Sequence, residues 1–538
     1  MAGCENASRC VAGVFVTNFL VALIIFIKIW RCDVSGVQDG FMLLLSVMWV
    51  VPLGLLVGMF VGALPGLNSS GMLAVMLPLL ILMPPEIGLI FTVSLYAGGE
   101  VGNSFPAVML NIPGNASSAV TAIEGYPMTL RGEGAKALGI CIMASTLGAV
   151  IGGLAAITAA PVLANFALRF SSVEIAIVIV FGLVAIAQVA TGSLLKGIMA
   201  GALGLLVAAI GTDPIWGQFR GTFDSVYLYD GMPVIPVLIG LLGFSELLKI
   251  IENGAEKPKA QTLTSIGLQG IVSGFKSVLR KPLDWIPASA TGLIVGIIPG
   301  AGSSVASFIA YQQSMAMAGE DDRKAFGNGS EKGLIAADTA NNSMVGGSLV
   351  PLLTLGIPGS SSMAVMLVVM GYHNLQIGPL LFQNHPELAY AVLLSQFVAS
   401  IFMLVIGTCL AWFAYRLASV PVNTFLPVVA VFCLIGGFAQ NQYVFDMGIM
   451  LIFGVIGFVM KKNGYSVIAL LLGVILGSLF EGHVNRAIMM GQGSFEIFFT
   501  RPLALLLWGL LFITLLGPYL VRWLRRSKQF QRSSVQGL

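Results

Sequence analysis

Residues 355–362 read LGIPGSSS, and residues 110–118 read LNIPGNASS. Each stretch places a Pro-Gly break and several polar side chains inside an otherwise apolar region. Proline ends a continuing helix, the glycine allows a sharp turn, and the Asn and Ser residues that follow are types that begin helices. We therefore expect a helical hairpin tip at each motif. The first candidate binding residues are these: Pro113, Gly114, Asn115, Ser117, Ser118, Pro358, Gly359, Ser360, Ser361 and Ser362.

The composition predicts a membrane protein. The 538 residues are 57% hydrophobic and only 9% charged, with a mean hydropathy of +0.93, whereas about 25% of residues in soluble proteins are charged. We expect an all-α polytopic protein with roughly 11–13 spans. The expected spans are 11–30, 41–62, 138–160, 173–190, 196–212, 233–251, 284–298, 388–412, 424–438, 444–460, 465–480 and 503–521. Shorter apolar pieces at 71–83, 87–97, 105–112, 344–356 and 362–371 predict re-entrant or discontinuous helices.

The two halves of the chain repeat the same order of motifs. GALPGLNSS at 62–70 matches GIIPGAGSS at 296–304, and each is followed by an apolar run, an Ile-Pro-Gly motif and Gly-Tyr. Such repeats, with helices broken in matching places, indicate the binding site of a secondary transporter, and we expect them to be inverted. A structural role alone remains the alternative, because Gly and Pro are common in membrane helices. The repeat adds these candidates: Asn68, Ser69, Ser70, Ser303 and Ser304.

Charge and motif positions divide the chain into five parts. Basic residues gather in one polar connection and in the C-terminal tail, which places both on the cytoplasmic side. The expected parts are an N-terminal anchor helix and loop (1–40), a first transport repeat (41–251), a cytoplasmic linker (252–283), a second repeat (284–500), and a last span with a basic tail (501–538).

The helix breaks suggest how an anion is bound. A helix N-terminus attracts a carboxylate by about 0.3–1 kcal/mol, which is less than the several kcal/mol that burying one charge costs. We therefore predict that Na⁺ or H⁺ is bound with the substrate. Asp338, with Asn341 and Asn342 beside it, is a candidate for the ion path, as is Glu100; the alternative is a hydrated position at a loop mouth. We expect Glu124 to be solvated.

The most specific blocks are GALPGLNSS, LNIPGNASSAVTAIEGYPM, GIIPGAGSS and DTANNSMVGGSLVPLLTLGIPGSSS. In this order they resemble the large membrane subunit of tripartite tricarboxylate transporters, the TctA family. The resemblance implies a multi-pass permease of the bacterial inner membrane. It also implies a small membrane subunit and a periplasmic solute-binding protein as partners, and import of citrate or a related carboxylate. Asp338, Asn68 and Glu124 depart from the family's usual residues, which leaves open a carboxylate other than citrate.

Other function classes fit the sequence less well. The three histidines show no protease or metal spacing, and the six cysteines show no metal or redox spacing, so we expect no enzyme and no bound cofactor besides the coupling ion. Nothing indicates nucleic-acid binding. A scaffold subunit would not need two sets of polar breaks. A binding-protein-independent cation/dicarboxylate symporter and a carboxylate channel remain alternatives.

Overall fold

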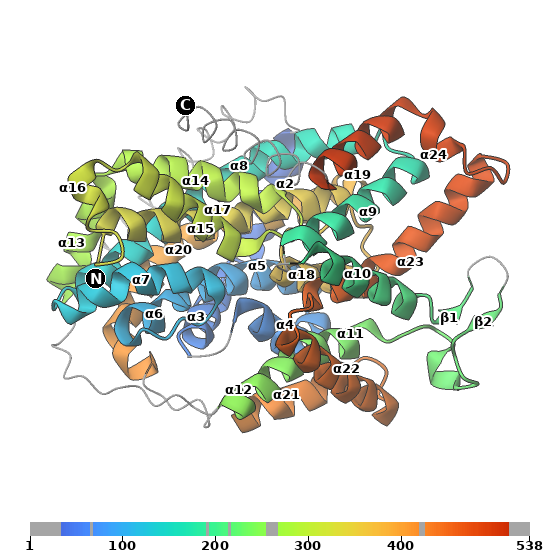
Figure 1. The fold of residues 1–538 in the computed structure, drawn as a ribbon, viewed down its shortest axis with the longest axis horizontal. Helices are drawn as coiled ribbons and strands as arrows, with labels where there is room; N and C mark the ends of the chain where they lie inside the picture. Colours follow the sequence, from blue (N-terminus) through green and yellow to red (C-terminus); the bar gives the residue numbers. More distant parts are fainter. Residues whose placement is uncertain are drawn as a thin grey trace, which may run out of the picture.

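The structure is a computed structural model that describes residues 34–64, 68–189, 193–213, 217–253, 267–418 and 426–515. In the first half the helices are α2 (Val34–Ser46), α3 (Val50–Gly62), α4 (Ser69–Leu82), α5 (Pro85–Gly102), α6 (Ser104–Leu110), α7 (Ala116–Leu130), α8 (Gly134–Ala167), α9 (Ser172–Val189), α10 (Leu194–Ala208), η1 (Val226–Leu228), α11 (Val234–Leu238), the π-helical η2 (Ile239–Phe244) and α12 (Ser245–Asn253). The second half contains α13 (Leu268–Leu279), α14 (Pro282–Ile297), α15 (Gly302–Met317), α16 (Glu320–Arg323), α17 (Glu331–Leu355), α18 (Ser361–Tyr372), α19 (Pro379–Asn384), α20 (Pro386–Ala418), α21 (Leu426–Ala439), α22 (Val444–Lys462), α23 (Val467–Met490) and α24 (Ile497–Thr500). A short antiparallel pair, β1 (Gly211–Thr212) and β2 (Phe219–Arg220), projects at one end (Figure 1).

The predicted all-α membrane fold is confirmed, but fewer helices than the expected 11–13 reach spanning length. Within the described ranges, five are long and apolar enough: Gly134–Ala167, Val234–Glu252, Pro386–Phe413, Val444–Lys462 and Val467–Met490. The expected span 41–62 is instead a pair of helices that bends by 68° between Ser46 and Val50, and counting it as one span gives six. Several other expected spans are shorter apolar helices of 10–17 residues, such as Leu194–Ala208.

The centre of the molecule is helix α17, in which every residue from Gly333 to Thr354 is buried. It packs against α8, α14 and α15, which lie around it in Figure 1. Glycines allow the contact with α8: a Cβ on Gly152 would lie 2.6 Å from the Ser343 carbonyl oxygen, and one on Gly346 would lie 2.3 Å from the Gly152 backbone. Small residues at such crossings are typical of membrane helices, whose association depends on close packing.

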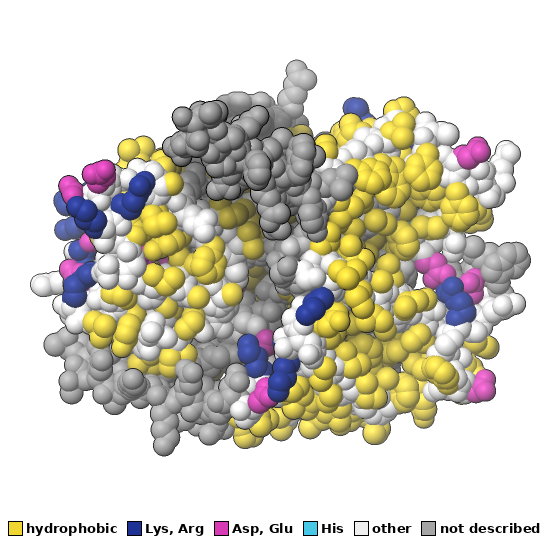
Figure 2. Space-filling model, viewed as in Figure 1, with side chains coloured by type: hydrophobic (Ala, Val, Ile, Leu, Met, Phe, Trp, Pro, Cys, Tyr) yellow, Lys and Arg dark blue, Asp and Glu magenta, His cyan; other side chains and the backbone are white. Residues whose placement is uncertain are grey.

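The outer surface is strongly apolar. Figure 2 shows hydrophobic side chains over much of the face in view, with Lys, Arg, Asp and Glu in small groups at the left edge, at the lower middle and on the right. Large side chains such as Leu206, Trp412 and Ile513 are exposed on this molecule. An apolar surface of this extent is suited to contact with lipid rather than with water.

Both predicted hairpin tips are present and share the same local geometry. The C-cap residues of α6 and α17 are Asn111 and Gly356, and both adopt the left-handed conformation (φ 58° and 71°). Four residues later, Asn115 and Ser360 are the N-caps of α7 and α18. The repeat therefore extends to backbone conformation at these breaks, while the inverted relation of the two halves stays a prediction.

Several sequence predictions fall on parts of the chain outside the described residues. These are the anchor helix 11–30, the Pro65-Gly66 turn, most of the linker between α12 and α13, and the basic C-terminal tail. The expected domain limits also stay predictions. Helix α13, at the end of the predicted linker, packs against α8: a Cβ on Gly139 would lie 2.2 Å from the Ile271 carbonyl oxygen.

Candidate functional site

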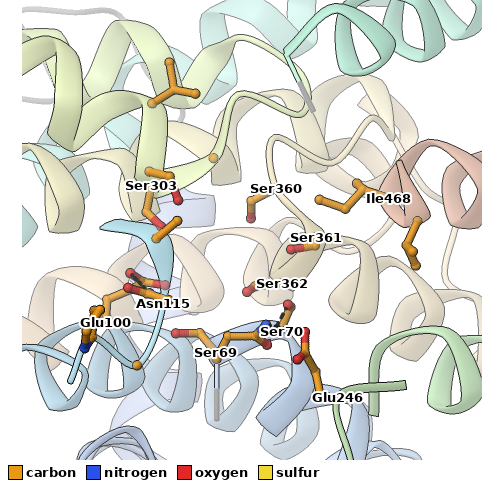
Figure 3. A pocket seen from close by; sticks show the side chains of 18 of the residues that line it. Ser69, Ser70, Glu100, Asn115, Glu246, Ser303, Ser360, Ser361, Ser362 and Ile468 are labelled. Atoms are coloured by element: carbon orange, nitrogen blue, oxygen red, sulfur yellow. Dashed lines mark hydrogen bonds between the residues drawn. The ribbon is translucent and has the colours of Figure 1, made fainter. Parts of the chain in front are cut away.

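A cavity of about 800 Å³ lies where five helices begin. The first residues of α4, α7, α15, α18 and α23 all line it, so five helix N-termini face one space. Most of the predicted binding residues are in its wall: Asn68, Ser69, Ser70, Pro113, Gly114, Asn115, Ser303, Ser304, Ser360, Ser361 and Ser362. Figure 3 shows the Ser69, Ser70 and Ser360–Ser362 side chains around this space.

Polar N-caps begin four of these helices. The Asn68 side chain accepts a hydrogen bond from the Gly71 amide (2.7 Å), and Asn115 accepts one from the Ser118 amide (2.8 Å). Ser360 and Ser466 cap α18 and α23 in the same way. Helix α15 begins without a side-chain cap. Each cap satisfies one backbone donor, so other first-turn N–H groups remain available to a ligand.

Helix α5 holds both hairpin tips. The Tyr96 hydroxyl donates to Ser360 Oγ (3.3 Å) at the second tip. One turn later, the Glu100 carboxylate accepts hydrogen bonds from Asn115 Nδ2 (3.1 Å) and Ser117 Oγ (3.2 Å) at the first tip. Glu100 is only 2% exposed, which excludes the hydrated loop-mouth position. Its carboxylate makes no ion pair with any described residue, so its hydrogen-bond partners are neutral.

The glycines of the two Ile-Pro-Gly motifs are required by packing. A Cβ on Gly114 would lie 2.1 Å from Asn103 Oδ1, and a Cβ on Gly359 would lie 2.5 Å from the Gly296 carbonyl oxygen. Asn103, between α5 and α6, is fully buried and donates to Ser69 Oγ (3.1 Å), which joins the start of the first hairpin to the start of α4. These close approaches bring the tips against their neighbours, which a larger residue would prevent.

The other predicted site residues lie behind the cavity wall. Ser117 and Ser118 support the first tip, and Pro358 and Gly359 form the turn before Ser360. Asp338, Asn341 and Asn342 lie inside α17 and do not line the cavity. Asp338 is fully buried and accepts from Ser104 Oγ (2.6 Å) and Thr121 Oγ1 (3.2 Å). The hydrated alternative is therefore wrong for Asp338 too.

Sequence reasoning missed one wall of the cavity. Glu246, Lys249 and Lys461 line it, together with Tyr465 and Ser466. Ser466 had a visible signal, because a serine directly before a long apolar run is typical of an N-cap. No sequence signal indicated that the charged residues of this wall lie together, since Glu246 and Lys461 are 215 residues apart.

The expectation for Glu124 is also wrong, because its side chain is fully buried. The carboxylate accepts hydrogen bonds from the backbone amides of Gly327, Gly329 and Ser330 at 2.6–2.8 Å, and from the Tyr311 hydroxyl at 2.6 Å. The loop that leads into α17 wraps around this side chain. Glu124 therefore joins α7 of the first half to α17 of the second.

Comparisons with known proteins agree with the motif order. The family model described as the tripartite tricarboxylate transporter TctA family matches residues 48–472. An uncharacterized 52.8 kDa protein in the TAR-I ttuC' 3' region of Agrobacterium vitis is 30% identical over 477 residues, which cover 88% of this chain and 93% of that protein. An uncharacterized protein in the TAR-II ttuC' 3' region of the same organism is 29% identical over 219 residues, 41% of this chain and 90% of that protein. No solved structure matches.

Proposed function

This chain belongs to the tripartite tricarboxylate transporter TctA family, and from that premise we propose that it is the large permease subunit of a binding-protein-dependent secondary transporter. The family is one of transporters, not enzymes, and its systems combine a large membrane subunit with a small one and a periplasmic binding protein. The proposed substrate is a tricarboxylate such as citrate or a related carboxylate. The proposed location is the bacterial inner membrane.

The convergence of five helix N-termini on one cavity carries this proposal. Each N-terminus attracts an anion by about 0.3–1 kcal/mol, so five together contribute roughly 1.5–5 kcal/mol. Transferring one carboxylate out of water costs several kcal/mol. The helix ends therefore approach the cost of holding one carboxylate, and the hydroxyls around them add direct hydrogen bonds.

Glu100 supports coupling to a cation. Its carboxylate lies in the cavity wall, where it accepts hydrogen bonds from Asn115 Nδ2 and Ser117 Oγ, and it has no cationic partner among the described residues. A buried carboxylate in that position favours a bound Na⁺ or a proton. Asp338, enclosed by Ser104 and Thr121, is a second candidate in the ion path, with Asn341 and Asn342 one turn away.

Uptake in cells lacking their own carboxylate transporters tests the function. The chain is co-expressed with the small membrane subunit and the solute-binding protein of its system, and labelled citrate, succinate, malate, tartrate and acetate are supplied with and without Na⁺. Concentrative uptake of one acid that requires all three proteins supports the proposal. Uptake without the binding protein would favour the independent symporter, and equilibration alone would favour a channel. No carboxylate uptake by three folded proteins would refute the substrate class.

A further inference from the structure

A basic group forms a separate wall of the cavity. Lys461 is the penultimate residue of α22, and Glu246 and Lys249 lie on α12. Figure 3 shows Glu246 and Glu100 on different sides of the space, so this wall is distinct from the first hairpin tip. With all four side chains ionised, the two lysines balance the two carboxylates. Lys249 makes no ion pair with a residue that the structure describes, so it adds positive charge next to the Lys461–Glu246 pair.

The Lys461 ammonium has one donor that no described residue accepts. Its Nζ atom donates to Glu246 Oε1 at 2.7 Å and to Ser245 Oγ at 2.8 Å. An ammonium has three donors, and the side chain remains 25% exposed within the cavity wall. Glu246 Oε1 also accepts from Asn68 Nδ2 at 3.0 Å. Glu246 therefore keeps one hydrogen-bond partner if Lys461 turns towards an anion.

We propose that Lys461 binds a carboxylate of the substrate, and that Glu246 holds the ammonium when the cavity holds no anion. The inference rests on the proposed function and deepens it. One carboxylate lies at the helix N-termini and a second reaches Lys461, so the site selects acids with at least two carboxylates over monocarboxylates. The arriving carboxylate competes with Glu246 for the ammonium, while Lys249 raises the potential of the same wall.

The test measures uptake KM for the best-transported acid of the panel in Lys461→Met, Lys461→Arg and Glu246→Gln variants. A hydrogen bond to a charged group contributes about 1.5–3 kcal/mol, so we expect Lys461→Met to raise KM roughly tenfold or more. Arginine keeps the charge and should retain most of the affinity. Glu246→Gln removes the competitor and should lower KM. If the Lys461–Glu246 pair had only a structural role, Lys461→Met and Glu246→Gln would change KM in the same direction.

Lys462→Met is the matched control. Lys462 is the adjacent residue of α22 and also pairs with a glutamate, Glu252, but its side chain is 61% exposed and does not line the cavity. We expect its KM to be unchanged. Wild-type-like KM in Lys461→Met, or a raised KM in Glu246→Gln, would overturn the inference while wild-type uptake still supports the proposed function. If Lys461→Met does not fold, the KM of Glu246→Gln tests the inference: a lowered KM supports it and a raised KM overturns it. No uptake of any carboxylate by the wild type would overturn both.

Discussion

Replacing Glu100 with glutamine is the most direct test of cation coupling. The carboxylate is 2% exposed and accepts hydrogen bonds from two neutral groups, Asn115 and Ser117. Burying its charge costs several kcal/mol, against about 1.5–3 kcal/mol from each hydrogen bond to it. The two bonds together offset about 3–6 kcal/mol of that cost, but they supply no positive charge, which a monovalent cation bound there would provide. Glutamine preserves the shape and keeps one oxygen that can accept from Asn115 and Ser117, but it carries no charge to hold that cation.

The expected decrease in substrate accumulation follows from the one positive charge that the variant no longer carries inward in each transport cycle. One positive charge moving inward gains about 2.3 kcal/mol per 100 mV, and a factor of ten corresponds to about 1.4 kcal/mol. With Na⁺ and H⁺ equal on both sides and 100 mV imposed, Glu100→Gln should therefore accumulate substrate roughly 40-fold less than the wild type. Exchange of labelled for unlabelled substrate without a gradient should persist.

The assay uses proteoliposomes in which a potassium diffusion potential sets the voltage. Glu252→Gln is the control, since Glu252 is a partly exposed glutamate that pairs with Lys462 away from the cavity. We expect it to accumulate substrate as the wild type does. Accumulation by Glu100→Gln at the wild-type level would refute the assignment of the coupling cation to Glu100. Loss of exchange together with accumulation, in folded protein, would also refute it and indicate a role in substrate binding or structure.

Three further predictions concern single positions. Gly359→Ala should destabilise the protein by about 1–3 kcal/mol, because its Cβ would lie 2.5 Å from the Gly296 oxygen; an unchanged melting temperature in detergent would show that the tip can shift. Glu124→Gln weakens charge-assisted hydrogen bonds and should lower stability by about 1.5–3 kcal/mol at unchanged KM; a raised KM would instead place Glu124 in transport. Ser361 lines the cavity with no hydrogen bond to a described residue, so Ser361→Ala should raise uptake KM about 2- to 10-fold at wild-type stability; unchanged KM would contradict substrate contact there.

The amino-acid sequence by itself determined the membrane class and the positions of the helix breaks. Proline lacks a backbone donor, and Asn115 and Ser360 cap the helices that follow through amides three residues away. These interactions are local, so a short stretch of sequence predicts them. The ordered repeat then indicated that the breaks act together, and the tips do meet at one cavity, held by α5.

Only the tertiary structure decided which charged residues join that cavity. Lys461 reaches Glu246 across 215 positions, and Glu124 binds the backbone of Ser330 across 206. The tertiary structure also shows that Glu100 lines the cavity, whereas Asp338 is buried behind the cavity wall. The physical reason is that a cap depends on residues within one helical turn. An ion pair or a buried carboxylate depends instead on which distant helices pack together.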